Sequence, residues 1–395
     1  MSVDFDQRLS RAGTHAVKLD ARQAVFGAPD VTPLWVADMD FPAPEAITRA
    51  LVERARHPVY GYSMFPDSLY SALIDWFRTR HHWAIERDWV VLAPGVVPSI
   101  HAACLAFTDP GEAVIVQPPV YPPFFSAVSK TGRRVVENPL VARDGQYRMD
   151  LEHLEQCARD GARLLLLCSP HNPVGRVWSE TELDDVLAIA RRYDLLVLSD
   201  EIHADLVFPD QSPHSVLAAR ANRDDPVITA VAPSKSFNVP GLGLSALVVP
   251  DPERRRALAQ VFDQWHAGQC NPFSAAGFEA AFREGGPWLD ALLVYLQASR
   301  DRVLERFRAI PAIRPVVPEG TYLMWLDCRG LGLSDQALRR FFIEQAGLGL
   351  NPGSSFGTGG QGFMRLNLAS PQPVLMEALD RLQAAVARQV RSGAS

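Results

Sequence analysis

Four polar side chains, far apart in the sequence, carry groups that can act together on an amino acid: Asn172, Asp200, Lys235 and Arg365. A lysine amine can bond covalently to an aldehyde, and a carboxylate can keep a pyridine nitrogen protonated. An amide can donate a hydrogen bond to a phenolate oxygen, and a guanidinium binds a carboxylate through two parallel hydrogen bonds. The set therefore matches the demands of one cofactor, pyridoxal phosphate, and of an amino-acid substrate.

Each of these residues also has an ordinary structural explanation. Most lysines lie on the surface, an aspartate after a strand is often a helix N-cap, and asparagine is common in turns. His203, three residues after Asp200, either orients that carboxylate or is a satisfied structural histidine. However, Lys235 follows a predicted strand, near the edge of the sheet where open α/β folds bind ligands. Arg365 lies inside an apolar run, where its charge is costly unless it meets a carboxylate.

Two further segments can serve the same cofactor. Gly95 follows a predicted strand and precedes the predicted helix Val97–Phe107, and backbone amides at such a helix N-terminus bind phosphate. Ser234 can add a hydroxyl group to that phosphate site. Tyr121 lies between prolines, where a rigidly held ring either forms an ordinary turn or stacks on a planar ligand.

Strands and helices alternate around these residues. Short apolar runs predict strands at Trp89–Leu92, Ala113–Val116, Arg163–Cys168, Leu195–Leu198, Val227–Val231 and Leu244–Val249. A capping box at Ser179–Glu182 predicts a helix over Thr181–Tyr193. Continuous apolar strands separated by helices indicate an α/β fold with a mostly parallel sheet that helices cover on both faces.

A chain of 395 residues is too long for one average domain, so its length fits either two domains or one large α/β unit. We predict that residues 1–44 form an N-terminal arm, that residues 45–286 form a large cofactor-binding domain, and that residues 287–395 form a small C-terminal domain. The arm and the C-terminal third together make a smaller α+β unit. Its predicted elements are a helix over Trp288–Ile310, a strand over Thr321–Asp327, a helix from Ser334, a strand over Met364–Leu368 and a final helix from Val374.

The composition argues against several classes of partner. A net charge of −6 is unsuited to nucleic acid, which needs a basic face, and to an anionic membrane surface. The 5 cysteines are scattered without a CxxC pair, so we expect neither a disulfide framework nor a zinc site, and no other metal. The first residues lack the apolar stretch of a signal peptide, and no apolar run is long enough to span a membrane. We therefore expect a cytoplasmic protein.

Taken together and in this order, the residues resemble the fold-type I pyridoxal phosphate enzymes, the aspartate aminotransferase superfamily, over nearly the whole chain. Within that superfamily, the segments Pro33–Pro42, Gly61–Ser63, Asp200–Leu206 and Lys235–Asn238 resemble the MalY/PatB-type carbon–sulfur β-lyases, which are cystathionine β-lyase-like. The stretch Asn271–Asp301 has a similar pattern. The resemblance implies a seven-stranded central sheet and a homodimer with shared active sites.

The resemblance also implies a role for each residue. Lys235 would bond covalently to the cofactor, Asp200 would pair with its ring nitrogen, and Arg365 would bind the substrate carboxylate. Tyr121 would stack on the ring and take part in catalysis, and Asn172 would hold the phenolate oxygen. Val96, Val97 and Ser234 would hold the phosphate, and His203 would also contact the cofactor. Ala37 and Asn172 would contact the substrate. Tyr62 would reach the cofactor phosphate of the neighbouring subunit.

The chain departs from relatives at two positions. Gly243 stands where relatives often carry a phosphate-binding cation, and Pro122 stands where they often carry a second aromatic residue. The phosphate must then rely on amides, hydroxyl groups and Tyr62.

Two reactions fit these residues equally well. Removal of the substrate Cα proton by Lys235 leads either to elimination of a thiolate from Cβ or to transamination, and only the family likeness favours elimination. A third interpretation, a regulator that has lost catalysis, is disfavoured because Lys235, Asp200 and Arg365 are all present.

Overall fold

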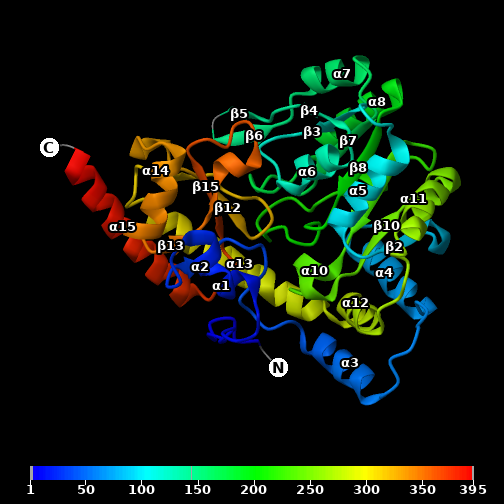
Figure 1. Ribbon diagram of the computed structural model, residues 1–395, viewed down its shortest axis with the longest axis horizontal. Coiled ribbons are helices and arrows are strands. Elements are labelled where there is room, and N and C mark those ends of the chain that lie inside the picture. The colour runs from blue at the N-terminus through cyan, green and yellow to red at the C-terminus, as the bar shows by residue number, and fades with distance from the viewer. Residues whose placement is uncertain (1–2, 144, 394–395) are drawn as a thin grey trace.

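The computed structural model describes residues 3–143 and 145–393, which form two groups of elements (Figure 1). The helices are α1 Val17–Asp20, α2 Arg22–Phe26, α3 Glu45–Arg56, α4 Asp67–Arg80, α5 Val96–Phe107, α6 Pro123–Lys130, α7 Leu151–Arg159, α8 Glu180–Tyr193, α9 Leu217–Arg220, α10 Pro233–Ser236, α11 Pro252–Gln264, α12 Pro272–Glu284, α13 Gly286–Phe307, α14 Asp335–Arg340 and α15 Gln372–Gly393. The strands are β1 Thr32–Pro33, β2 Val90–Ala93, β3 Ala113–Val116, β4 Arg134–Glu137, β5 Val141–Arg143, β6 Gln146–Arg148, β7 Leu164–Cys168, β8 Leu196–Asp200, β9 Val227–Val231, β10 Ser245–Val248, β11 Arg314–Pro315, β12 Leu323–Asp327, β13 Leu348–Gly349, β14 Asn351–Pro352 and β15 Phe363–Asn367.

The larger group is built on a 7-stranded sheet with the order β2-β10-β9-β8-β7-β3-β4. Strands β4, β3, β7, β8 and β9 run parallel, and β10 is antiparallel to both of its neighbours. This confirms the predicted mostly parallel sheet. In a parallel arrangement, the carboxyl ends of successive strands meet at one edge, so the loops after β7, β8 and β9 lie together.

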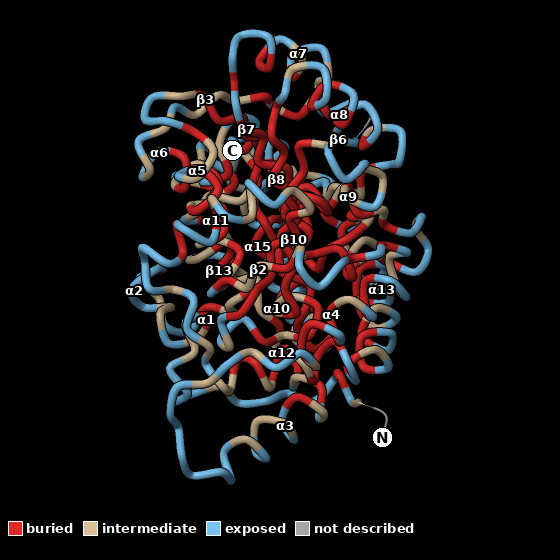
Figure 2. The backbone as a smooth tube through the Cα atoms, turned by 90° about the vertical axis from the view of Figure 1, so that its right-hand side faces the viewer, coloured by how far each residue is buried: buried red, intermediate tan, exposed pale blue. Residues whose placement is uncertain are grey.

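Both faces of this sheet are covered. Along β7, Leu164 and Leu166 pack in a cluster with residues of α5, α6 and α11, whereas Leu165 and Leu167 pack in a cluster with residues of α7 and α8. Side chains of successive strand residues point to opposite faces, so a run of leucines suits a strand that is buried on both sides. Figure 2 shows this burial concentrated along the central strands, while α3 is largely exposed.

The six strands predicted for this sheet are all present, with ends that differ by at most two residues. The seventh strand, β4, has only two apolar residues, flanked by Arg134 and Glu137, and it lies at the sheet edge with Arg134 exposed. Charged residues are typical of edge strands, where they discourage pairing with other chains. The predicted capping box at α8 is also present, with Ser179 and Glu182 each bonding to the backbone of the other.

The C-terminal third contains a 4-stranded sheet with the order β11-β12-β15-β14. Its core joins α13, α14 and α15 with residues of the strands. The arm belongs to this group, since β1 pairs with β13 in parallel and Leu34 lies in the same core.

The domain boundaries at residues 44 and 286 stay a prediction. Helix α13 contributes Leu289 and Leu292 to a core shared with α4 and α12, but Val303 and Phe307 to the C-terminal core. One continuous helix therefore ties the two groups together. No helix in the described part of the chain is long and apolar enough to cross a membrane, and the same residues contain no cluster of side chains suited to a metal ion.

Candidate active site

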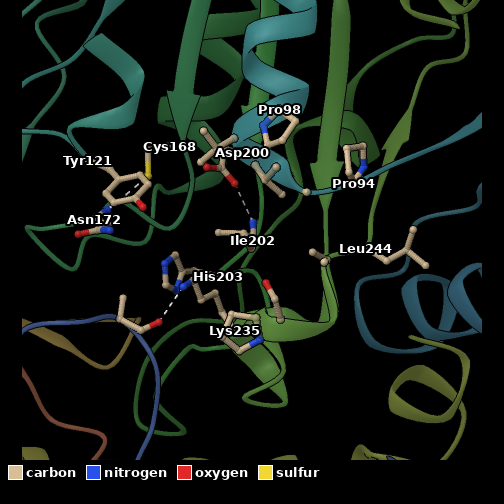
Figure 3. Close-up of a pocket in the computed structure, with 18 residues that line it drawn as sticks. Pro94, Pro98, Tyr121, Cys168, Asn172, Asp200, Ile202, His203, Lys235 and Leu244 are labelled. Carbon is tan, nitrogen blue, oxygen red and sulfur yellow. Dashed lines mark hydrogen bonds between the residues drawn. The ribbon is translucent and has the colours of Figure 1, made fainter. Parts of the chain in front are cut away.

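A cavity of about 230 Å³ lies at the carboxyl ends of β7, β8 and β9 (Figure 3). The predicted residues that line it are Ala37, Val96, Val97, Tyr121, Asn172, Asp200, His203, Ser234 and Lys235. They come from the arm, from the start of α5, from the segments that follow β3 and β7, from the end of β8 and the turn after it, and from helix α10. The fold thus brings together almost the whole set that the sequence indicates.

Lys235 lies in the one-turn helix α10, which directly follows β9. Its Nζ atom donates a hydrogen bond of 2.7 Å to the carbonyl oxygen of Ala37. Burial, and then the charge of Arg365, lowers the pKa of this amine to about 8, against the opposing effects of Asp38 and Asp200. A substantial fraction of the amine is therefore neutral near physiological pH, as a nucleophile or base must be.

Asp200 is the last residue of β8, directly opposite Cys168 of β7. Its Oδ1 atom accepts a hydrogen bond of 3.1 Å from the backbone amide of Ile202. Within residues 3–143 and 145–393, it forms no ion pair. Burial raises the pKa of this carboxyl to about 7. A buried carboxylate without a cation is costly, which makes this position a site for a positively charged or proton-bearing group of a ligand.

Arg365 of β15 lies behind Asn172. It is a buried cation with no anionic partner among the described residues, which is the reverse of the situation at Asp200. Its guanidinium donates to Asn172 Oδ1 at 3.0 Å, to the Trp35 carbonyl at 2.8 Å and to Asn351 Oδ1 at 2.8 Å. These acceptors are all neutral, and the buried Nε atom has no hydrogen-bond partner among the residues described. Burial lowers the pKa of Arg365 to about 10. The group stays charged, and it is placed to receive an anion.

Asn172 lies between the Arg365 guanidinium and the cavity, which it lines. Its Oδ1 atom is occupied by Arg365, so its amide nitrogen can donate toward the cavity, as the predicted contact to a ring oxygen requires. His203 is buried and lines the same cavity, and its Nδ1 atom has no hydrogen-bond partner in the described part of the chain. Burial, and then Lys235 and Arg365, lowers the pKa of His203 to about 3. The imidazole is therefore neutral and has a hydrogen-bonding atom available for a ligand.

The far end of the cavity is formed by the first turn of α5. Val96 and Val97 lie in this turn, where backbone amides have no partner within the helix. Ser234 and Gly243 line the same cavity, and Gly243 has a positive φ of 58° that favours glycine. The only cation that lines the described cavity is Lys235, so an anion bound here depends on amides and hydroxyl groups.

Tyr62 lies outside this cavity. Its residue surface is 99% exposed, and it borders a separate hollow formed by residues 60–65 and 268–273. Tyr121, in contrast, reaches the cavity next to Asn172 (Figure 3). A role for Tyr62 in the active site thus requires a second chain.

Three residues that contribute to the site were not predicted from the sequence. Tyr322 donates a hydrogen bond of 2.9 Å to the Ala37 carbonyl, which Lys235 also uses. Asn351 holds Arg365, and its position opposite Arg365 in the β14–β15 pair is visible only in the fold. Cys168 lines the cavity at the end of its strand. The available signal for Cys168 was its place as the last residue of the predicted strand Arg163–Cys168.

A buried carboxylate fixes the turn that carries Lys235. Asp205 accepts hydrogen bonds from Ser236 Oγ at 2.8 Å, from Trp76 Nε1 at 3.0 Å and from His81 Nε2 at 2.8 Å. Its pKa is lowered because these donors outweigh the effect of burial, which acts in the opposite direction. Helix α10 is therefore attached to α4 through a network that does not itself line the cavity.

The sequence matches the family model for aminotransferase class I and II over residues 29–382. The chain therefore belongs to this family, and its fold and cavity agree with that membership.

Individual relatives show which members of this family the chain is similar to. The chain is 39% identical to cystathionine beta-lyase PatB of Bacillus subtilis (strain 168), over 97% of this chain and 100% of the relative. It is 33% identical to protein MalY of Escherichia coli (strain K12), over 98% of this chain and 100% of the relative. The crystal structure of cystalysin from Treponema denticola, which contains a pyridoxal 5'-phosphate cofactor, superposes with a TM-score of 0.94 at 35% identity, covering 98% of this chain and 100% of cystalysin. The resemblance to this group of enzymes is confirmed.

Proposed function

We propose that this protein is a pyridoxal-phosphate-dependent carbon–sulfur β-lyase that acts on L-cystathionine or another S-substituted L-cysteine. The observation that carries the proposal is that Lys235 and Asp200 line one cavity and that Arg365 lies directly behind the lining residue Asn172, while the carboxylate and the guanidinium both lack ionic partners among the described residues. The near full-length similarity to a cystathionine β-lyase supports the choice of reaction.

The cavity fits the cofactor in several independent respects. Among the described residues, Asp200 forms no ion pair and His203 Nδ1 has no hydrogen-bond partner, and Val96 and Val97 line the cavity in the first turn of α5, where backbone amides have no partner within the helix. We assign Lys235 to the aldehyde carbon, Asp200 to the ring nitrogen and Asn172 to the ring oxygen. Tyr121 covers the ring, and Ser234 assists the helix amides at the phosphate.

When bound, pyridoxal phosphate supplies an aldehyde that captures the substrate amino group and a ring that accepts the electrons released at Cα. Arg365 and Ala37 orient the substrate, with the guanidinium binding the α-carboxylate. Lys235 removes the Cα proton, since its pKa of about 8 leaves free amine available. Asp200 holds the proton at the ring nitrogen, which is what allows the ring to accept electrons.

Elimination then breaks the Cβ–S bond. The thiolate leaves with the electron pair of that bond and takes up a proton to become the thiol. Reaction of the remaining three-carbon fragment with one water molecule gives pyruvate and ammonia. Lys235 is the group placed to return the proton, because it is the only cationic side chain that lines the described cavity.

The test is pyruvate formation from L-cystathionine by the cofactor-loaded protein with no keto acid added. A lyase produces pyruvate, thiol and ammonia in equal amounts over many turnovers. An aminotransferase stops after one turnover without an acceptor, and that result would replace our proposal. A panel of S-substituted cysteines in the same assay then identifies the preferred leaving group.

We propose further that the active unit is a homodimer, with Tyr62 of one chain at the phosphate of the other. Support comes from the exposed apolar side chains around it, since Val59, Tyr60 and Met64 are all exposed, and such patches are typical of interfaces. Mixing inactive Tyr62→Phe chains with inactive Lys235→Ala chains should restore activity, because one site of each mixed dimer has both native residues. If subunits exchange and no activity returns, Tyr62 does not act across the interface.

We also propose a domain division and a cellular location for this protein. We propose the division into an arm (1–44), a large domain (45–286) and a small domain (287–395), with the cavity lined by the large domain and by Ala37 of the arm. We also propose a cytoplasmic location, because the 5 cysteines are unpaired and 4 of them are buried.

A further inference from the structure

A cluster of opposite charges ties the N-terminal arm to the segment that borders the cavity. Lys18 is completely buried, with its Nζ atom 2.9 Å from Asp40 Oδ2 and 3.5 Å from Asp38 Oδ1. Arg11 reaches the same two carboxylates, at 2.7 Å from Asp38 Oδ2 and 3.0 Å from Asp40 Oδ1. These four residues, Arg11, Lys18, Asp38 and Asp40, are called the arm quartet below. Its two cations match its two anions.

The segment next to the quartet supplies backbone contacts to both proposed reactive groups. The Ala37 carbonyl accepts from Lys235 at 2.7 Å, and the Trp35 carbonyl accepts from Arg365 at 2.8 Å. The carbonyl of Asp38 accepts from Lys18 and from Asn367. A shift of this segment would therefore change the surroundings of the catalytic amine and of the carboxylate-binding guanidinium together.

The quartet also contributes to the charge that Lys235 experiences. The charged groups that face its amine are Arg365 from β15, Asp38 from the arm segment and Asp200 from β8, with His203 beside them. Arg365 and burial favour the free amine, whereas the two carboxylates favour the ammonium form. Arg11 opposes the charge of Asp38 at the partly exposed side of the quartet, where its side chain is 24% exposed.

We propose that Arg11 and Lys18 are positioning residues that hold the Trp35–Asp38 segment against Lys235 and Arg365 and that balance the charge of Asp38 next to the catalytic amine. This inference rests on the proposed function, because it assigns a purpose to the surroundings of Lys235. Lys18 holds the segment in place on its buried side. Arg11 offsets the negative charge of Asp38 from the side nearer to solvent.

The experiment follows pyridoxal phosphate uptake by the cofactor-free protein through the visible absorbance of the bound cofactor. Its rate requires a neutral lysine, so the pH profile has an acid limb that reports Lys235. Arg11→Gln leaves excess negative charge near Lys235, and we expect this limb to move to higher pH by about 0.5 unit or more. Arg11→Lys keeps the charge and should return the limb toward its native position.

Arg8→Gln is the matched control. Arg8 lies on the same arm, but it pairs with Glu377 at the surface, with both side chains more than half exposed, so its removal should leave the limb in place. The proposal is overturned if Arg11→Gln and Arg8→Gln give the same profile as the native protein, or if Arg11→Lys shifts the limb as far as Arg11→Gln. Failure of the native protein to take up pyridoxal phosphate would instead overturn the proposed function, which separates the two outcomes.

Discussion

The arm quartet and the cavity both contain buried charges close to Ala37. The charges of the quartet are paired with opposite charges, whereas those of the cavity are not. In the quartet, Lys18 meets two carboxylates within 3.5 Å. In the cavity, Lys235 meets a carbonyl oxygen, and Asp200 meets a backbone amide. Buried charges are normally paired, so the quartet looks like structure and the cavity looks like a site prepared for a charged ligand. Perturbed groups of this second kind cluster at functional sites.

The largest expected effect comes from removing the unpaired carboxylate. Asp200→Asn preserves shape but cannot keep the ring nitrogen protonated, so turnover should fall by about 10² to 10⁴-fold. Steady-state kinetics with the cofactor-loaded variant measures this, and circular dichroism checks that the fold is intact. Turnover within a few-fold of the native value would mean that Asp200 is only structural.

The same substitution at the two buried lysines, Lys18 and Lys235, should change the free energy of unfolding in opposite directions. Lys18→Met leaves Asp38 and Asp40 with one cation fewer, and removing one partner from a buried pair is expected to destabilise the fold by about 3–5 kcal/mol. Lys235→Met removes a charge that burial already disfavours, and it should stabilise the cofactor-free protein by about 1–3 kcal/mol at neutral pH. Urea denaturation of the two cofactor-free variants gives both values. If both variants lost stability equally, the charge of Lys235 would be as well compensated as that of Lys18, which would contradict the contrast between quartet and cavity.

The same contrast predicts a pH dependence. Because burial raises the pKa of Asp200 to about 7, the folded protein holds a proton between about pH 4 and pH 7 that the unfolded chain has released. The stability linked to this proton is fully present below about pH 4 and is lost as the pH rises through about 7, by up to about 4 kcal/mol. The free energy of unfolding of cofactor-free native protein, minus that of Asp200→Asn, should fall across this window. A constant difference would show that Asp200 is ionised throughout.

The smallest effect concerns the guanidinium. Arg365→Lys keeps a positive charge but loses the planar pair of donors, so substrate binding should weaken by about 1.5–3 kcal/mol, which corresponds to roughly a 10- to 150-fold higher KM. Pyridoxal phosphate affinity should change much less. Kinetics and cofactor titration on one preparation compare the two. If cofactor loss dominated, Arg365 would be a phosphate ligand.

Much of the cavity was predictable because its residues stand at the ends of apolar strands. Asp200 and Lys235 follow strands that the leucine- and valine-rich runs mark clearly, and parallel packing brings such ends together. The edge strand β4 was missed because its two valines are flanked by the charged residues Arg134 and Glu137, which leaves an apolar run of only two residues. Pattern reasoning depends on such a contrast.

What the sequence could not indicate are contacts between residues that meet only in the folded chain. The Arg365–Asn172 hydrogen bond joins residues 193 positions apart, and Lys235 reaches a backbone oxygen 198 positions away. The quartet is equally hidden, since Lys18 is one of several polar residues in an arm without periodicity. Tyr322 gave no signal because its hydroxyl group bonds to a backbone atom rather than to a recognisable partner.

The most direct test is a crystal structure of the cofactor-loaded protein with a bound, unreactive amino acid. Our account predicts that the ring nitrogen lies within hydrogen-bond distance of Asp200, that the amino-acid carboxylate lies on Arg365, and that the phosphate lies on the first turn of α5. The arm quartet should stay intact, because its charges are already matched. A cofactor whose phosphate lies on Arg365, with Asp200 still facing only the Ile202 amide, would contradict the account.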